Sequence, residues 1–223
     1  MSQIELLNVE KRYGRIRALA SLSLDLPAEG LTLLQGPNAA GKSTLLRVLS
    51  GLTRPTRGTV RVFGVDLYRG AAQGVRGRIG YLGSEPGLYG ALSVTENLRL
   101  AARLWGRSDD DVTGAIERHA LGHVATRPAH TLSFGYRRRV GVARALIAEP
   151  DILLLDEPWN GLDDAACARL GQTLEGLRKQ GTCAIVAAHS VGSYASIFDR
   201  SLRIDQGTVI DGPSANEPPD DAG

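Results

Sequence analysis

A glycine-rich segment near the start of the chain has the residue types that hold phosphate groups. Residues 36–44 read Gly-Pro-Asn-Ala-Ala-Gly-Lys-Ser-Thr and match the pattern G-x-x-x-x-G-K-[ST]. Glycines let the backbone turn so that successive N–H groups face phosphate oxygens, Lys42 can reach the outer phosphates of ATP, and the Ser43 hydroxyl can bind Mg²⁺. The pattern predicts a phosphate-binding loop with these ligand residues: Asn38, Ala39, Ala40, Gly41, Lys42, Ser43 and Thr44.

Two carboxylates follow an apolar segment in the second half of the chain. Residues 152–155 are all apolar, and Asp156 and Glu157 come directly after them. Ligands of open α/β sheets bind at the carboxyl ends of the strands, so both carboxylates are expected beside the phosphate-binding loop. Asp156 suits the acidic group that holds Mg²⁺, and Glu157 is placed to orient or deprotonate an attacking water.

Two kinds of apolar pattern indicate two kinds of strand around these groups. Short apolar runs typical of buried strands alternate with helical patterns that begin near Lys42 and continue to Leu177; the runs are residues 31–34, 79–82, 152–155 and 182–188. This alternation predicts an α/β fold with a parallel sheet covered on both faces. Other segments have the character of antiparallel strands, and a final hairpin is expected around Gly207: residues 2–9, 18–26, 59–63, 202–204 and 208–210.

Helical patterns fill the middle of the chain, from about residue 84 to 149. Ser93 and Glu96 have the spacing of a capping box, and residues 108–111 could cap a second helix. A third helix is expected over residues 135–148. It contains the arginine run 137–139, which is typical of a solvated helix face.

The composition is that of a globular domain with no strong charge bias. The chain has 223 residues, is 43% hydrophobic, and has a formal net charge of +2, which is too small to argue for direct nucleic-acid binding. The start of the chain lacks the features of a signal peptide, and no run of about 18 apolar residues occurs, so we expect a cytoplasmic protein. One catalytic domain is expected over residues 1–210, followed by a disordered acidic tail at 211–223.

Three further stretches, together with the loop and the carboxylates, resemble the nucleotide-binding subunit of ATP-binding-cassette (ABC) transporters. They are residues 132–136 (Leu-Ser-Phe-Gly-Tyr, the signature loop), residues 160–163 (Asn-Gly-Leu-Asp) and His189, which follows an apolar strand. The resemblance covers about residues 2–210. It implies the P-loop NTPase fold of the family: a RecA-like core with a parallel sheet, an antiparallel β subdomain and an inserted α-helical subdomain.

The resemblance also implies roles for individual side chains. Tyr13 would stack on adenine, with strand packing as the alternative. Ser133 and Gly135 would cap the γ-phosphate held by the opposite subunit. Asp163 would belong to a loop that crosses between subunits, although it could equally be a helix N-cap. His189 would contact the γ-phosphate and would form the catalytic set with the two residues already singled out, Lys42 and Glu157.

The chain departs from the family pattern at three positions. A metal-contacting glutamine usually follows the strand at residues 79–82, and here the register leaves Ser84 and Glu85 both open. Our hypothesis is that Glu85 substitutes for it as a metal ligand. In the signature loop, Phe134 replaces a glycine and Tyr136 the usual glutamine.

The resemblance implies an ATPase that binds ATP and Mg²⁺ and works as a head-to-tail homo- or heterodimer. It would power transport, most similar to that of bacterial haem-exporter-like or multidrug-like systems, through a separately encoded integral membrane subunit at the inner face of the cell membrane. The alternative is a soluble ABC-type ATPase acting on nucleic acid or in a non-transport assembly. The single ABC domain and the lack of a coiled-coil insertion argue against most proteins of that kind.

Overall fold

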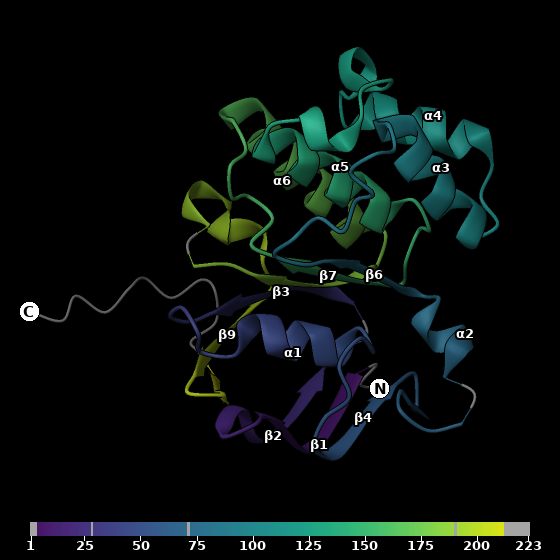
Figure 1. Ribbon diagram of the computed structural model, residues 1–223. Helices are drawn as coiled ribbons and strands as arrows, with labels where there is room; N and C mark the ends of the chain where they lie inside the picture. The colour runs from purple at the N-terminus through teal and green to yellow at the C-terminus, as the bar shows by residue number, and fades with distance from the viewer. Residues whose placement is uncertain (1–3, 28, 71, 190, 212–223) are drawn as a thin grey trace, which may run out of the picture.

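Two sheets of different kinds form the framework of the protein (Figure 1). The computed structural model describes residues 4–27, 29–70, 72–189 and 191–211. The larger sheet has the order β10-β9-β3-β8-β7-β6, with β3 at Gly30–Gln35, β6 at Ile79–Leu82, β7 at Ile152–Asp156, β8 at Cys183–Ala187, β9 at Arg200–Asp205 and β10 at Thr208–Asp211. Neighbouring strands in it are parallel except for the β9–β10 hairpin, which confirms the predicted parallel sheet and the final hairpin.

The smaller sheet is antiparallel and has the order β2-β1-β4-β5. Its strands are β1 at Ile4–Tyr13, β2 at Ile16–Leu26, β4 at Arg57–Val62 and β5 at Val65–Asp66. Leu6 lies opposite both Leu24 and Val60, as expected for segments that bury alternate residues. β1 and β2 run further than predicted because irregularities in register near Lys11 interrupt the alternation without ending the pairing.

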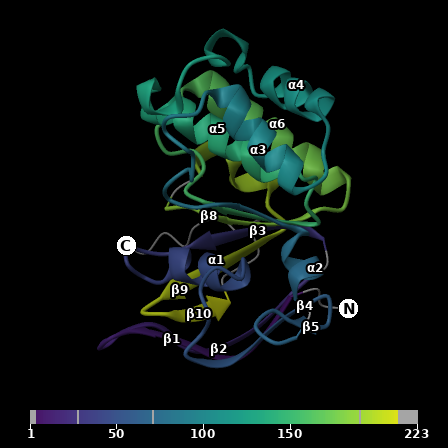
Figure 2. The same ribbon diagram turned by 45° about the vertical axis from the view of Figure 1, so that its right-hand side comes forward.

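One helix, α1 (Lys42–Leu49), lies between the two sheets, as Figures 1 and 2 show. Leu45, Leu46 and Leu49 are at most 1% exposed and pack into a core that includes residues of both sheets. This burial fixes the start of α1 relative to the carboxyl edge of the parallel sheet. A short helix, α2 (Gln73–Arg76), leads from the antiparallel sheet to β6.

The other face of the parallel sheet is covered by α5 and α6, and α3 and α4 lie beyond them (Figure 2). The helices are α3 at Val94–Leu104, α4 at Asp109–Arg118, α5 at Phe134–Leu146 and α6 at Asp164–Lys179, with short 3-10 helices at Gly122–Val124, Ala129–Thr131 and Gly192–Ile197. Ser93 and Ser108 each form a capping box; the first was predicted as such, and the second helix start was predicted to be capped by residues 108–111. α3, α4 and one side of α5 form a separate apolar core, which is that of the inserted helical subdomain.

Asp211 is the last residue of β10, so the final strand ends one residue beyond the predicted domain boundary. The tail predicted to be disordered was residues 211–223, of which residues 212–223 lie outside the described residues. Among the described helices, none is long and apolar enough to cross a bilayer.

Candidate functional site

The phosphate-binding loop connects the end of β3 to the start of α1. Gly36 has φ +155° and a Cβ there would overlap the Ile204 carbonyl oxygen; Gly41 has φ +114° and its Cβ would lie 2.6 Å from the Ala18 carbonyl oxygen. Only glycine fits these close approaches. Ala39 is also left-handed, at φ +63°, so the predicted loop is held in an unusual backbone conformation.

The N-terminus of α1 is available to an anion. Its N-cap is Gly41, which offers no capping side chain, and the first turn contains no acidic residue. Uncapped N–H groups and the positive end of the helix dipole favour phosphate at such a place. Ala40 is buried and anchors the loop, since its carbonyl accepts a 2.9 Å hydrogen bond from Gly207 N–H. Two of the other predicted ligands, Ser43 and Thr44, lie at the start of α1.

Lys42 is 6% exposed and its ammonium group bonds back to the loop. Nζ donates to the carbonyl oxygens of Gly36 at 2.7 Å and Pro37 at 3.2 Å. It also lies 3.7 Å from Glu157 Oε1. The predicted lysine and glutamate, 115 positions apart in the chain by their numbers, are therefore brought together at one edge of the sheet.

Asp156 ends β7 with only 1% of its surface exposed, and neither carboxylate oxygen has a hydrogen-bond partner. A buried carboxylate without partners is costly, and a bound cation would compensate for it. No cluster of three or more His, Cys, Asp or Glu side chains suited to a metal occurs in the described part of the chain. Mg²⁺ fits this donor set, because it is usually held by one or two carboxylates together with waters and substrate phosphates.

Glu157 has a left-handed backbone, at φ +49°. Its N–H donates to the Ala187 carbonyl oxygen at 2.7 Å, and its Oε2 accepts the His189 backbone N–H at 3.2 Å. A non-glycine residue in this conformation costs about 1 kcal/mol or more, and such residues gather at functional sites. The predicted catalytic residues Lys42, Glu157 and His189 thus share one edge of the parallel sheet.

The signature loop lies against the segment at residues 160–163. Ser133 is the N-cap of α5 and its Oγ accepts the Tyr136 N–H at 3.3 Å. A Cβ at Gly135 would overlap the carbonyl oxygen of Gly161, so only glycine allows this contact. None of the hydrogen bonds or ion pairs among the described residues joins Ser133 to the phosphate-binding loop of its own chain.

The remaining predicted site residues have mixed outcomes. Asp163 is the N-cap of α6, with Oδ1 accepting the Ala166 N–H at 2.7 Å, which is the simpler of its two interpretations. Tyr13 is 43% exposed at the end of β1, with the Lys11 ammonium group 4.9 Å from its ring centroid, and stacking on adenine stays a prediction. Ser84 and Glu85 are both exposed after β6, and the role of Glu85 as a metal ligand also stays a prediction.

The expectation that residues 137–139 form a solvated helix face was wrong. Arg138 is 1% exposed and Arg139 is 8% exposed. α5 is covered by the sheet on one side and by the helical subdomain on the other, so a charged residue on it can still be buried. The sequence signal for this burial was that apolar residues such as Val140 and Val142 follow the arginine run and lie on both sides of the helix.

An aromatic cluster near Glu157 was not predicted from the sequence. The Trp159 ring stacks on Tyr194, with centroids 5.8 Å apart and planes 18° apart, and meets Phe198 edge-on at 6.4 Å. It joins the loop after β7 to the segment that follows His189. No local pattern indicates this contact, because Trp159 is distant in the sequence from Tyr194 and Phe198.

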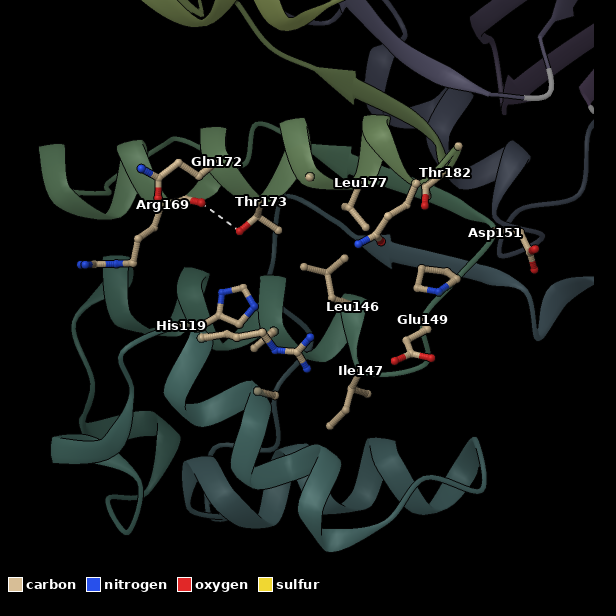
Figure 3. Close-up of a pocket in the computed structure, with 17 residues that line it drawn as sticks. His119, Leu146, Ile147, Glu149, Asp151, Arg169, Gln172, Thr173, Leu177 and Thr182 are labelled. Carbon is tan, nitrogen blue, oxygen red and sulfur yellow. Dashed lines mark hydrogen bonds between the residues drawn. The ribbon is translucent and has the colours of Figure 1, made fainter.

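A cavity of about 770 Å³ lies away from these groups, between α6 and the α4–α5 pair. Figure 3 shows Gln172 and Thr173 of α6 on one side of it and His119 and Leu146 on the other. Burial lowers the pKa of His119 to about 4, and the charges of nearby arginines add to this effect: Arg118, Arg139 and Arg169. His119 is therefore a neutral, structural histidine near pH 7.

Because the folded-state pKa of His119 lies below its usual 6.5, the unfolded chain takes up a proton first as the pH falls. Stability from this group is complete above about pH 6.5 and declines between about pH 6.5 and 4, by up to about 3 kcal/mol. Urea unfolding at several pH values is expected to show that His119→Gln removes this decline. His130→Gln, on the surface, is the control, and an equal decline in the His119 variant would contradict the prediction.

Comparison with known proteins agrees with this geometry. A family model described as ABC transporter matches residues 19–160. The cytochrome c biogenesis ATP-binding export protein CcmA of Ruegeria pomeroyi is 40% identical over 187 residues, covering 83% of this chain and 85% of that protein. The lantibiotic transport ATP-binding protein SrtF of Streptococcus pyogenes is 30% identical over 207 residues, covering 93% and 89%.

A solved structure shows the same fold. The dimeric ATP-binding cassette MJ0796, in a post-hydrolysis state bound to ADP and Pi, has a TM-score of 0.87 at 25% identity, covering 96% of this chain and 99% of that one. The segment of this chain that the family model matches includes both the phosphate-binding loop and Glu157. The chain therefore belongs to the ABC transporter family, as an ATP-binding subunit with ATPase activity.

Proposed function

We propose that this chain hydrolyses Mg-ATP within a dimer of ABC subunits and drives export through a separate integral membrane subunit. The observation that carries the catalytic part is the convergence of Lys42, Glu157 and the His189 backbone. The relatives support the transport part, since one is named an export protein and another a lantibiotic transport protein. The chain would then act at the cytoplasmic face of the membrane.

Lys42 is the residue whose contacts must change when ATP binds. Its ammonium group is held by two neutral carbonyls and by Glu157 at 3.7 Å. Phosphate oxygens compete well for this group, because hydrogen bonds between charged partners are about twice as strong as neutral ones. Once Lys42 bonds to the phosphates, the Glu157 carboxylate is free to orient a water and accept its proton.

Asp156 and Ser43 are the residues proposed to hold Mg²⁺. The unpartnered oxygens of Asp156 support this assignment. When bound, the ion would neutralise charge on the phosphate oxygens. Glu85 is the candidate for a further contact from the loop after β6.

Ser133, Gly135 and Asp163 are proposed to act on nucleotide held by the second subunit. Within one chain they cap helices or pack against Gly161, and the signature loop exposes 42% of Phe134. A head-to-tail dimer would place this exposed helix N-terminus over the partner's phosphates. The dimeric form of the structural neighbour supports such an arrangement, with either two identical or two different subunits.

A groove of about 530 Å³ in the helical subdomain, here named the docking groove, is the proposed docking site of the membrane subunit. Its lining includes Tyr89, Leu100 and Leu104, which are 63%, 37% and 74% exposed. Arg144 also lines it; burial lowers the pKa of this guanidinium, and none of the described carboxylates forms an ion pair with it. A short apolar helix that carries an acidic residue is the partner segment that fits these features.

Leu104→Asp is expected to disrupt this docking without damaging the ATPase. The change introduces a charge on an exposed apolar position, so stability should change by about 0.5 kcal/mol or less. The measurement is ATPase activity of the isolated chain, and of the membrane complex purified through a tag on it. We expect normal activity of the isolated chain but loss of the membrane subunit and of its stimulation.

Leu52→Asp is the matched control, because Leu52 is 67% exposed and lies outside the lining of the groove. It should retain the complex. If the wild-type chain hydrolyses ATP yet recruits no integral membrane protein, the transport function is wrong. If Leu104→Asp retains a fully stimulated complex, the transport function stands but this docking surface is wrong.

A further inference from the structure

Arg138 is the most unusual side chain near the site, because a full positive charge lies inside the protein. It is on α5, five positions after the signature residue Ser133, and is 1% exposed. No ion pair joins it directly to a carboxylate among the described residues, and its partners are backbone carbonyls. A buried charge persists only where many hydrogen bonds compensate for its lost hydration.

The guanidinium group of Arg138 donates to four backbone carbonyl oxygens in two segments of the chain, residues 83–84 and 156–157. Nη1 donates to Gly83 at 2.8 Å and to Ser84 at 2.7 Å. Nη2 donates to Asp156 and, at 2.6 Å, to Glu157. These carbonyls lie at the carboxyl ends of β6 and β7, so one side chain ties α5 to both strand ends.

The electrostatic surroundings agree with this placement. Burial lowers the pKa of Arg138, and the negative charges of Asp156, Glu157 and Glu85 oppose that shift. Arginine stays protonated in proteins. Its charge therefore faces the site's carboxylates, while its hydrogen bonds go to their backbone.

We propose that Arg138 is a positioning residue that fixes the backbone of Glu157 to the helix that follows the signature loop. Glu157 is held on both sides, since its N–H donates to Ala187 and its carbonyl accepts from Arg138. Its left-handed backbone, at φ +49°, depends on such constraints. The inference rests on the proposed function, in which Glu157 activates water and the signature loop meets the second subunit's nucleotide.

This arrangement connects three parts of the protein through one side chain. A shift of α5, when the signature loop engages nucleotide, is passed directly to the Glu157 carbonyl. The loop at Gly83 and Ser84 is moved with it, and that loop leads into the groove that begins at Gly87. Arg138 thereby links catalysis to both subunit closure and the docking groove.

Arg138→Gln tests the proposal, with Arg139→Gln as the matched control. Arg139 is a buried arginine on the same helix, and it donates to the carbonyls of His119 at 2.6 Å and Ala120 at 2.9 Å, in the helical subdomain. The measurements are kcat and KM for phosphate release, the ATP dissociation constant, ATP-dependent dimerisation, and thermal unfolding of each variant. Glu157→Gln is run beside them.

A positioning role predicts a specific combination of results. Arg138→Gln should lower kcat by about 10- to 100-fold, as small misplacements of reacting groups do, with KM and the ATP dissociation constant little changed. Like Glu157→Gln, it should still form the ATP-bound dimer, which a merely structural defect would weaken. Arg138→Lys, which keeps the charge but fewer hydrogen bonds, should recover part of the lost kcat. Arg139→Gln should retain kcat.

Each other outcome overturns a defined claim. If Glu157→Gln is slow but Arg138→Gln hydrolyses ATP as fast as Arg139→Gln, Arg138 does not position Glu157. If Arg138→Gln loses ATP binding and dimerisation together with kcat, its role is structural. If Arg138→Gln does not fold, Arg138→Lys decides by the same criteria. If Glu157→Gln itself is fully active, the proposed function fails first.

Discussion

Glu157→Gln is expected to lower kcat for ATP hydrolysis by about 100-fold or more, since general-base groups contribute about 10²- to 10⁴-fold. The amide is close in size to the carboxylate but cannot accept the proton of an attacking water. It can still accept the His189 N–H, so the backbone geometry should persist. ATP binding should remain, and removing a negative charge 3.7 Å from Lys42 should favour it. We expect size-exclusion chromatography with Mg-ATP to show an accumulated dimer.

Glu149→Gln is the control for this substitution. Glu149 is 67% exposed and pairs with Arg107 far from the phosphate-binding loop, so its loss should leave kcat unchanged. Phosphate release at the wild-type rate in Glu157→Gln would show that another group activates the water. Slow hydrolysis without an ATP-bound dimer would support the catalytic role of Glu157 but contradict the proposed two-subunit mechanism.

Lys42→Ala should weaken ATP binding by about 10- to 100-fold, because each charge-assisted hydrogen bond contributes about 1.5–3 kcal/mol. The substitution also leaves Glu157 without its nearby cation, so like charges would then face one another when ATP enters. Titration calorimetry with ATP at fixed Mg²⁺ gives the dissociation constant directly.

Lys179→Ala is the matched control for this second substitution. Lys179 is 74% exposed at the end of α6 and pairs with Glu175, so its removal should not alter ATP binding. A dissociation constant for Lys42→Ala within about threefold of wild type, under 1 kcal/mol, would mean that Lys42 does not bind the phosphates.

Residues that belong to a recognisable local sequence pattern were predictable from the sequence. Gly36 and Gly41 stand where the backbone passes close to other carbonyls, and the motif marks both. Ser93 was identifiable as a cap because its partner lies three positions away. Residues 152–155 of the strand that delivers Asp156 and Glu157 are all apolar, as is typical of a central parallel strand.

Residues that depend on distant partners and belong to no local pattern were not predictable. The burial of Arg138 requires two strand ends, at residues 83–84 and 156–157, to converge beside α5. Trp159 likewise finds Tyr194 only after the sheet has formed. Ser84 and Glu85 stayed open because the loop after β6 has no repeating pattern that would establish its register.

α5 belongs to two apolar cores at once, whereas α1 belongs to one that spans both sheets. The helix that follows the phosphate-binding loop is therefore packed between the two sheets. α5 instead packs on two sides: Val142 and Ala145 belong to the core beneath the parallel sheet, and Val140 and Ala143 belong to the core of the helical subdomain. If Arg138 has the proposed positioning role, a displacement of this helix on nucleotide binding would reach both cores.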